Sequence, residues 1–247
     1  LPNLKSFREV STEVKQQFVH LMQEINLLKA FETLIHCGLL DIYLPEFADL
    51  KGQMQFDRYH KYPTDQHIFN ILKEISSIFD KNFDKSIKIP LAIDIGKKIK
   101  RNDLLFISGL FHDLGKGRNV DHSIWGADAI EEFAKAHDYP PEDISLMKFL
   151  VKDHLLLSST AQKQDIYNIQ TIINFSSIVG SVRYLNFLYL LTVCDIRATN
   201  PALWNNWTNS LLDTLYTETK SYLEHDKSGY VQDLMIQHKK DRLLEIT

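Results

Sequence analysis

The stretch DLLFISGLFHDLGK, residues 103–116, decides the fold class of this chain. Its first nine residues are almost all apolar, which predicts a fully buried helix. Gly115 and Gly117 follow and help to end that helix. His112 and Asp113 therefore fall at the C-terminal end of a core helix. A carboxylate is costly there unless it is paired or bound to a metal ion.

Helical periodicity continues over most of the remaining sequence. The 247 residues include only nine Gly and seven Pro, and they show no convincing strand alternation. We therefore predict an all-α fold, a multi-helix bundle that forms a single domain over residues 1–247 with its core at about 44–216. The predicted flanking segments are a helix at 12–37 and a more polar tail at 226–247. Further helices are predicted at 122–137, 142–157, 181–197 and 203–223. Another is predicted to begin at Thr64 or Asp65, either of which can cap it, and to carry an apolar stripe from Ile68 to Phe79.

Composition and charge exclude several classes of protein. The 28 basic and 32 acidic side chains give a net charge of −4, which does not favour a nucleic-acid partner. Cys37 and Cys194 are too few for a disulfide framework or a thiolate zinc site, so we expect a cytoplasmic location. No apolar stretch reaches the length of a membrane span. Because the first residue is Leu1, we expect either a processed product or a piece excised from a longer chain.

Six potential metal ligands are spread along the predicted helices. Asp195 follows the apolar run LLTVC, so it needs a partner as Asp113 does. Several imidazoles with two carboxylates suit a divalent transition ion better than calcium. A shared carboxylate can hold two such ions close together, and a centre of this kind hydrolyses phosphate esters. The six residues are His67, His112, Asp113, His122, His154 and Asp195.

Each of these residues taken alone is weak support for a metal site. A single histidine at a helix end is more often a structural or capping residue. Their order along consecutive segments, H, then HD, then H, H and D, is what favours a metal centre. The remaining histidines have no such placement, and we predict that they are surface or capping residues: His20, His36, His60, His137, His225 and His238.

The ordered pattern resembles the HD superfamily of metal-dependent phosphohydrolases, which is named for the pair that is His112-Asp113 here. Four strings, MQFDRYHKYPTDQH, LFHDLGKGRNVDHSIWGA, HLLLSSTAQKQDI and LTVCDIRATNPALWNNW, are together similar to the HD domain of the bifunctional uridylyltransferase/uridylyl-removing enzymes of PII nitrogen signalling. The likeness covers about residues 44–216. Asn119 and Val120 depart from the small residues of that family's pattern, and no ligand is lost.

The resemblance implies hydrolysis of the bond between UMP and a tyrosine hydroxyl on uridylylated PII protein. It implies two divalent ions, manganese, iron, zinc or magnesium, with Asp113 shared between them. It also implies that the partners are uridylylated PII and the other domains of the full-length enzyme, and that this fragment has no transferase activity. The first ion would be held by His67, His112, Asp113 and Asp195, and the second by His122 and His154.

Three cations are candidates for contacts with the substrate phosphate. Lys116 matches the superfamily lysine expected near the scissile phosphate, and we assign it a catalytic role beside Asp113. Arg118 and Arg197 can bind phosphate bidentately, although each could equally be paired with a carboxylate. Two other functions stay open at this stage: an HD hydrolase of a free nucleotide, and a metal-stabilised regulatory module that has lost its catalysis.

Overall fold

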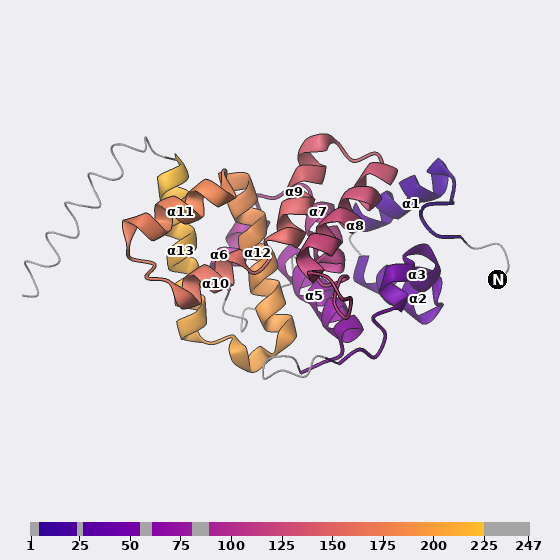
Figure 1. Cartoon of the computed structure of the whole chain (residues 1–247), viewed down its shortest axis with the longest axis horizontal. Coiled ribbons are helices and arrows are strands. Elements are labelled where there is room, and N and C mark those ends of the chain that lie inside the picture. The colour runs from indigo at the N-terminus through magenta and orange to yellow at the C-terminus, as the bar shows by residue number, and fades with distance from the viewer. Residues whose placement is uncertain (1–4, 24–26, 55–60, 81–88, 225–247) are drawn as a thin grey trace, which may run out of the picture. The chain divides into compact units, whose positions relative to one another are not determined.

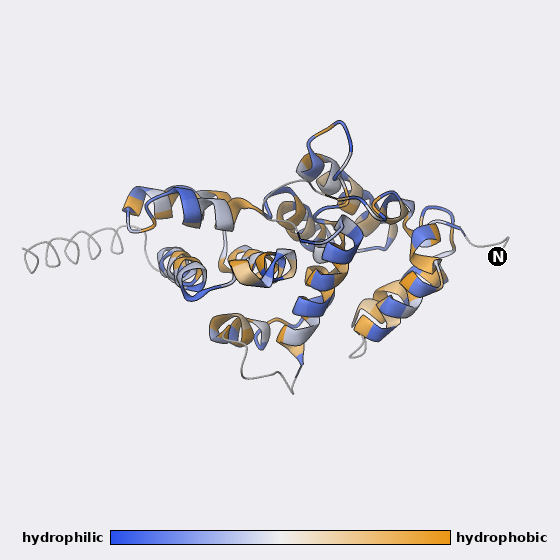
Figure 2. Ribbon diagram, turned by 90° about the horizontal axis from the view of Figure 1, so that it is seen from below, coloured by the Kyte–Doolittle hydropathy of each residue, from blue (hydrophilic) through white to orange (hydrophobic). Residues whose placement is uncertain are grey.

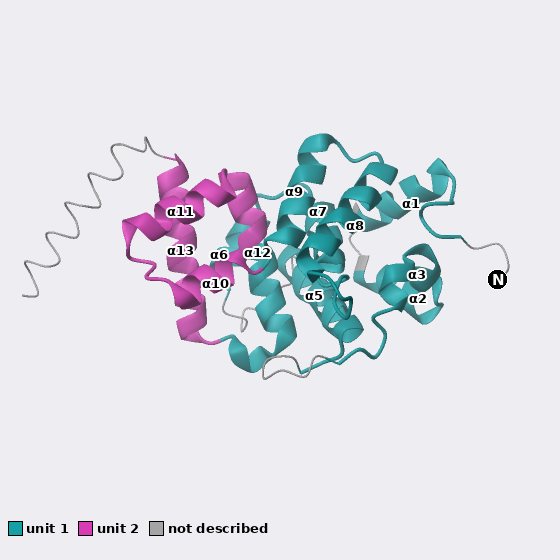
Figure 3. Cartoon of the chain, in the orientation of Figure 1, with its two compact units in different colours: residues 1–154, 190–204 teal, residues 155–189, 205–247 magenta. Residues whose placement is uncertain are grey.

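The computed structural model describes residues 5–23, 27–54, 61–80 and 89–224. Every regular element within these ranges is a helix (Figure 1), which confirms the predicted all-α class. The chain is divided into two compact units (Figure 3), with residues 1–154 and 190–204 in unit 1 and residues 155–189 and 205–247 in unit 2. The single domain expected over residues 1–247 stays a prediction.

Unit 1 holds nine complete helices in its described part. It also holds the C-terminal part of α12 (Val182–Thr199) and the 3₁₀ turn η1 (Pro201–Leu203). The nine helices are α1 (Thr12–Gln23), α2 (Leu27–His36), α3 (Leu39–Tyr43), α4 (Pro45–Ala48), α5 (Thr64–Phe79), α6 (Pro90–Gly96), α7 (Asn102–Phe111), α8 (His122–Ala136) and α9 (Pro141–Lys152).

Unit 2 contains α10 (Leu156–Lys163), α11 (Ile169–Val179), the first part of α12, and α13 (Asn206–Glu224). Helix α13 packs against α10 and α11 and buries Leu212 and Leu215. The Tyr216 hydroxyl donates a hydrogen bond of 2.6 Å to Asn186 Oδ1 on α12. Apolar burial and this polar contact together hold α13 in the unit.

Helix α7 is the central helix of unit 1. All its residues from Asp103 to Phe111 are buried, as its apolar sequence predicts, and it packs against α5, α8 and α9. A Cβ atom on Gly109 would lie 2.8 Å from Ile75 Cδ1 and 3.0 Å from Ile71 Cγ2. A glycine at this position therefore lets α5 and α7 approach closely, which brings the residues on the two helices within reach of one another.

Two predicted helices differ from the structure. Instead of one helix over 142–157, α9 ends at Lys152 and α10 begins at Leu156, so His154 lies in the turn between them and the prediction is wrong there. In the region of the predicted helix 12–37, α1 and α2 lie on either side of residues 24–26. Those three residues and the predicted tail 226–247 are outside the described part of the chain.

Hydrophobic and hydrophilic residues occur together along most helices (Figure 2), as expected where one face packs on a core. Within the described ranges, no single helix is both long enough and apolar enough to cross a membrane. Only the bent pair formed by α11 and α12 passes that test, when the two helices are taken together.

An aromatic cluster in unit 1 surrounds His137, whose side chain we predicted to be at the surface or at a helix end. His137 ends α8, which confirms the capping alternative of that prediction, and at 7% exposed it is not a surface residue. Its ring stacks on Phe133 with the centroids 3.8 Å apart, and Phe7 and Phe18 lie within 6 Å. Its Nδ1 contacts the Phe133 carbonyl at 2.7 Å and its Nε2 contacts the Tyr43 hydroxyl at 2.6 Å. Three of the other histidines, His60, His225 and His238, lie outside the described residues.

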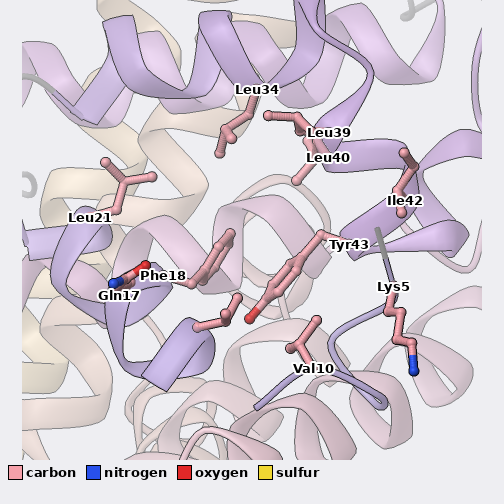
Figure 4. A pocket seen from close by; sticks show the side chains of 11 residues that line it. Lys5, Val10, Gln17, Phe18, Leu21, Leu34, Leu39, Leu40, Ile42 and Tyr43 are labelled. Carbon is pink, nitrogen blue, oxygen red and sulfur yellow. The ribbon is translucent and has the colours of Figure 1, made fainter. Parts of the chain in front are cut away.

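An open, mostly apolar pocket of about 450 Å³ lies beside this cluster, between α1, α2 and α3 (Figure 4). The rings of Phe18 and Tyr43 line it, together with aliphatic side chains such as Leu34 and Leu40. None of the six predicted metal ligands belongs to its lining. The predicted chemistry is therefore located elsewhere in unit 1.

Candidate metal centre

The six predicted metal ligands come together in unit 1. They form two groups, and within each group the ligand atoms lie no more than 4.8 Å apart: His67, His112 and Asp195 in the first, and Asp113, His122 and His154 in the second. The residues come from α5, the end of α7, the start of α8, the turn after α9, and α12. Their role as metal ligands stays a prediction, which the geometry allows us to test.

The first group is compact and largely buried. His67 Nε2 lies 3.3 Å from His112 Nε2 and 3.2 Å from Asp195 Oδ1. Asp113 approaches the same point, with its Oδ2 3.1 Å from His112 Nε2 and 3.4 Å from His67 Nε2. His67, His112 and Asp113 are each at most 2% exposed. Solvent therefore screens these charges weakly, and a cation among them would be held strongly.

Two backbone carbonyls fix the orientation of the buried imidazoles. His112 Nδ1 lies 2.8 Å from the Gly109 carbonyl, and His154 Nδ1 lies 2.8 Å from the Val151 carbonyl. A carbonyl oxygen can only accept, so Nδ1 carries the hydrogen in each ring, and Nε2 presents a lone pair whenever the ring is neutral. Lone pairs and carboxylate oxygens that face each other repel unless a cation or a proton lies between them. This set of donor atoms therefore fits a divalent ion.

Asp113 connects the two groups through its two oxygens. While Oδ2 faces the first group, Oδ1 lies 4.0 Å from His154 Nε2. This Oδ1 atom is buried and has no hydrogen-bond partner within the described ranges. A buried carboxylate oxygen without a partner is unfavourable, and a second cation beside His122 and His154 would satisfy it. The ring centroids of His122 and His154 are 5.8 Å apart. The residues thus fit two ions with Asp113 between them.

The charges in this pocket shift the pKa values of its members. Burial acts to lower the pKa of His67, but hydrogen bonds to the Asp113 and Asp195 carboxylates raise it to about 9. Burial also opposes ionisation of Asp113, yet positive charge on His112 and hydrogen bonds from His112 and His67 hold its pKa well below the usual range. The Lys116 ammonium, 2.7 Å from Asp113 Oδ2, acts in the same direction. Asp113 therefore stays ionised at neutral pH and attracts cations.

The two arginines predicted to contact phosphate are paired with carboxylates. An Arg118 nitrogen lies 2.8 Å from Asp49 Oδ2, and the guanidinium lies over the Trp125 ring, 4.0 Å from its centroid. Arg197 Nε donates to Glu74 Oε2 at 2.7 Å. The structure therefore shows the carboxylate-paired alternative for both arginines, and their contact with phosphate stays a prediction.

Sequence reasoning missed several residues that support the site. Thr199 Oγ1 lies 3.3 Å from Asp195 Oδ1, and the spacing of four residues on one helix could have indicated this contact. A Cβ atom on Gly117 would overlap the side chain of Gln53, so the loop before α5 packs against the loop after α7. Both loops lack a regular period, and no sequence signal indicates that Gln53 or Asp49 lies there.

Gly115 offers a direct test of the geometry of the second group. A Cβ atom there would lie 2.8 Å from His122 Cα and closer still to the His122 carbonyl oxygen. We expect Gly115→Ala to displace His122 and to weaken metal binding about 10- to 100-fold, as measured by calorimetric titration. Gly96→Ala, whose Cβ would lie 2.5 Å from Ile78 Cγ2 and meets no predicted ligand, is the control for packing. Equal metal affinity in Gly115→Ala and the parent would contradict this arrangement.

Residues 89–175 match the HD domain family, and this range contains His112, Asp113, His122 and His154. This chain contains an HD domain. The match includes the His-Asp pair that gives the family its name, and it ends before Asp195. His67 precedes the matched range and Asp195 follows it, so two of the six predicted ligands lie outside the match.

The HD domain and its flanking helices are also similar to longer enzymes. The chain is 45% identical to the bifunctional uridylyltransferase/uridylyl-removing enzyme of Pseudomonas aeruginosa strain UCBPP-PA14, over 75% of this chain and 20% of that protein. It is 46% identical to the enzyme of the same name from Azotobacter vinelandii strain DJ, over 75% of this chain and 20% of that protein. It is 39% identical to that of Pseudomonas savastanoi pv. phaseolicola, over 90% of this chain and 27% of that protein. The chain thus spans about a fifth to a quarter of the length of these relatives.

Proposed function

We propose that this chain is a metal-dependent phosphodiesterase that removes UMP from a tyrosine of uridylylated PII protein. The observation that supports this most is that the other five predicted ligands, from distant segments, converge around Asp113. The similarity to enzymes named for uridylyl removal points to the substrate. We also propose two bound divalent ions, manganese, iron, zinc or magnesium, a cytoplasmic location, and the other domains of a longer enzyme as partners.

Divalent ions bound here would polarise the phosphoryl oxygens and activate water. The imidazoles and the two carboxylates of the chain would hold these ions, and the Gly109 and Val151 carbonyls keep two of the rings oriented. Lys116 lies at the edge of the pocket, only 12% exposed, where its ammonium can stabilise negative charge on the phosphate.

The leaving group suits a site in which a general acid is not required. The oxygen of water bonds to phosphorus, the bond from phosphorus to the tyrosine oxygen breaks, and the tyrosine oxygen gains a proton. A phenol has a pKa of about 10, so tyrosinate leaves far more readily than an aliphatic alkoxide. Hydrolysis of a tyrosine ester therefore needs little help from proton donation.

A metal-restoration assay tests the proposal. We expect the purified chain, stripped with a chelator and reloaded with Mn²⁺, to release UMP from uridylylated PII, as followed by nucleotide chromatography. The same preparation without added metal should release only background UMP. If none of the four metals gives UMP release, while a deoxynucleotide triphosphate or an alarmone is hydrolysed, the free-nucleotide alternative is correct and our proposal is wrong.

A further inference from the structure

Large apolar side chains are exposed at few places in the described part of unit 1. Four of them are more than 40% exposed: Val14, Met54, Val120 and Ile124. Single exposed hydrophobic residues are common and need no explanation, whereas a group of them marks an interaction surface. Val14 lies on α1, and the other three belong to two segments near the candidate metal centre. We call Met54, Val120 and Ile124 the apolar rim.

The two segments of the apolar rim pack against each other. Arg118 pairs with Asp49 at 2.8 Å, and a Cβ atom on Gly117 would lie 2.6 Å from Gln53 Cδ. Met54 directly follows Gln53 in the chain. The loop 115–121 and the loop 49–54 thus form one edge of the site, close to the corner where α7 ends.

Val120 and Ile124 are tied to the same corner through the start of α8. Asp121 caps this helix, and its Oδ1 accepts hydrogen bonds from the amides of Ser123 and Ile124 at 2.9 and 3.3 Å. Val120 lies within the short loop that has Lys116 at one end and His122 at the other. Val120 is thus four residues from Lys116 and two from His122, and its side chain is 57% exposed.

We propose that the apolar rim contacts the polypeptide around the modified tyrosine of a protein substrate. This inference rests on the proposed function. A tyrosine oxygen is separated from its own backbone by one side chain only, so cleavage at the metal centre brings the flanking polypeptide onto the surrounding surface. Apolar side chains at this edge gain free energy when a polypeptide covers them.

The charges of the described residues around the site agree with a protein substrate rather than with a free polyphosphate. A nucleoside triphosphate or an alarmone carries several negative charges and calls for a cluster of cations. Arg118 and Arg197 are engaged by Asp49 and Glu74, and Lys116 contacts Asp113. Binding energy for the substrate is therefore supplied in part by apolar contact outside the metal centre.

Two substrates with the same scissile bond test this inference. Uridylylated PII has the flanking polypeptide, whereas the UMP ester of N-acetyltyrosinamide lacks it. We expect Val120→Ser and Ile124→Gln each to raise the KM for uridylylated PII roughly tenfold with kcat unchanged, because they remove apolar burial on binding. Both kinetic constants for the small ester should stay at the parent values. Val14→Ser, which changes a similarly exposed valine on α1, is the matched control and should alter neither substrate.

The possible results of this experiment lead to different conclusions about the inference and about the proposed function. An unchanged KM for uridylylated PII would show that the apolar rim makes no contact, and equal rises in KM for both substrates would show that the substitutions disturb the metal centre. Either result overturns the inference. If the metal-loaded parent releases UMP from neither substrate, the proposed function itself is wrong and the inference falls with it. Thermal unfolding of each variant checks that the fold is retained.

Discussion

Replacement of Asp113 by asparagine is expected to empty the candidate metal centre and to lower the rate of UMP release about a thousandfold. The Oδ2 atom of Asp113 lies within 3.4 Å of the Nε2 atoms of both His67 and His112, and Oδ1 faces His154. Asparagine keeps the shape but removes the negative charge, and its NH₂ group donates where a cation needs an acceptor. Bound ions stabilise the transition state by several kcal/mol, which corresponds to roughly three powers of ten in rate.

Two measurements check this result independently. Elemental analysis gives the number of metal ions per chain, and steady-state kinetics gives kcat with uridylylated PII. Asp128→Asn removes a carboxylate from α8 whose side chain is 72% exposed, and it should change neither value. An Asp113→Asn protein with the metal content and the kcat of the parent would show that Asp113 is not a ligand.

The fold could be predicted where the pattern of apolar residues is compatible with only one structure. Helix α7 is apolar on every side, and only burial satisfies that pattern. The prediction failed around His154 because apolar residues continue from Leu150 and Val151 through 155–157, so two helices and the turn between them look like one. Helices α4 and α6 were not predicted, since four and seven residues are too few to show a period.

The arrangement of the candidate site could be anticipated only in part. A carboxylate such as Asp113 at the end of an apolar helix is unfavourable without a partner, and this identifies it as a candidate whatever its distant neighbours are. The pairing of Arg118 with Asp49 follows from no such rule. These residues are 69 positions apart in two irregular loops, and only the folded backbone brings them together. Contacts between loops are therefore the part of the site that cannot be predicted from the sequence.

The burial of His137 could not be predicted from the sequence either. It leads to the second large expected effect, a loss of stability in mild acid. Burial lowers the pKa of His137 to about 4, and the nearby charge of Lys15 adds to the shift, whereas the Phe133 carbonyl opposes it. In the unfolded chain the pKa of a histidine is about 6.5. The unfolded state therefore binds more protons between pH 6.5 and 4, and stability that is complete above pH 6.5 is lost as the pH falls through this window. The loss reaches about 3 kcal/mol of unfolding free energy.

A His137→Phe variant separates this effect from every other titrating group. Phenylalanine can stack on Phe133 but cannot take up a proton. It leaves the Tyr43 hydroxyl without its contact to His137, at a cost that does not depend on pH. In urea unfolding experiments, the stability of the parent relative to the variant should fall by about 1.4 kcal/mol for each pH unit below 6.5. Proton uptake at the metal centre is common to both proteins and cancels in this difference. A difference that stays constant from pH 7 to pH 4 would contradict this prediction. It would mean that the folded protein protonates His137 as readily as the unfolded chain does, in spite of the aromatic rings packed around it.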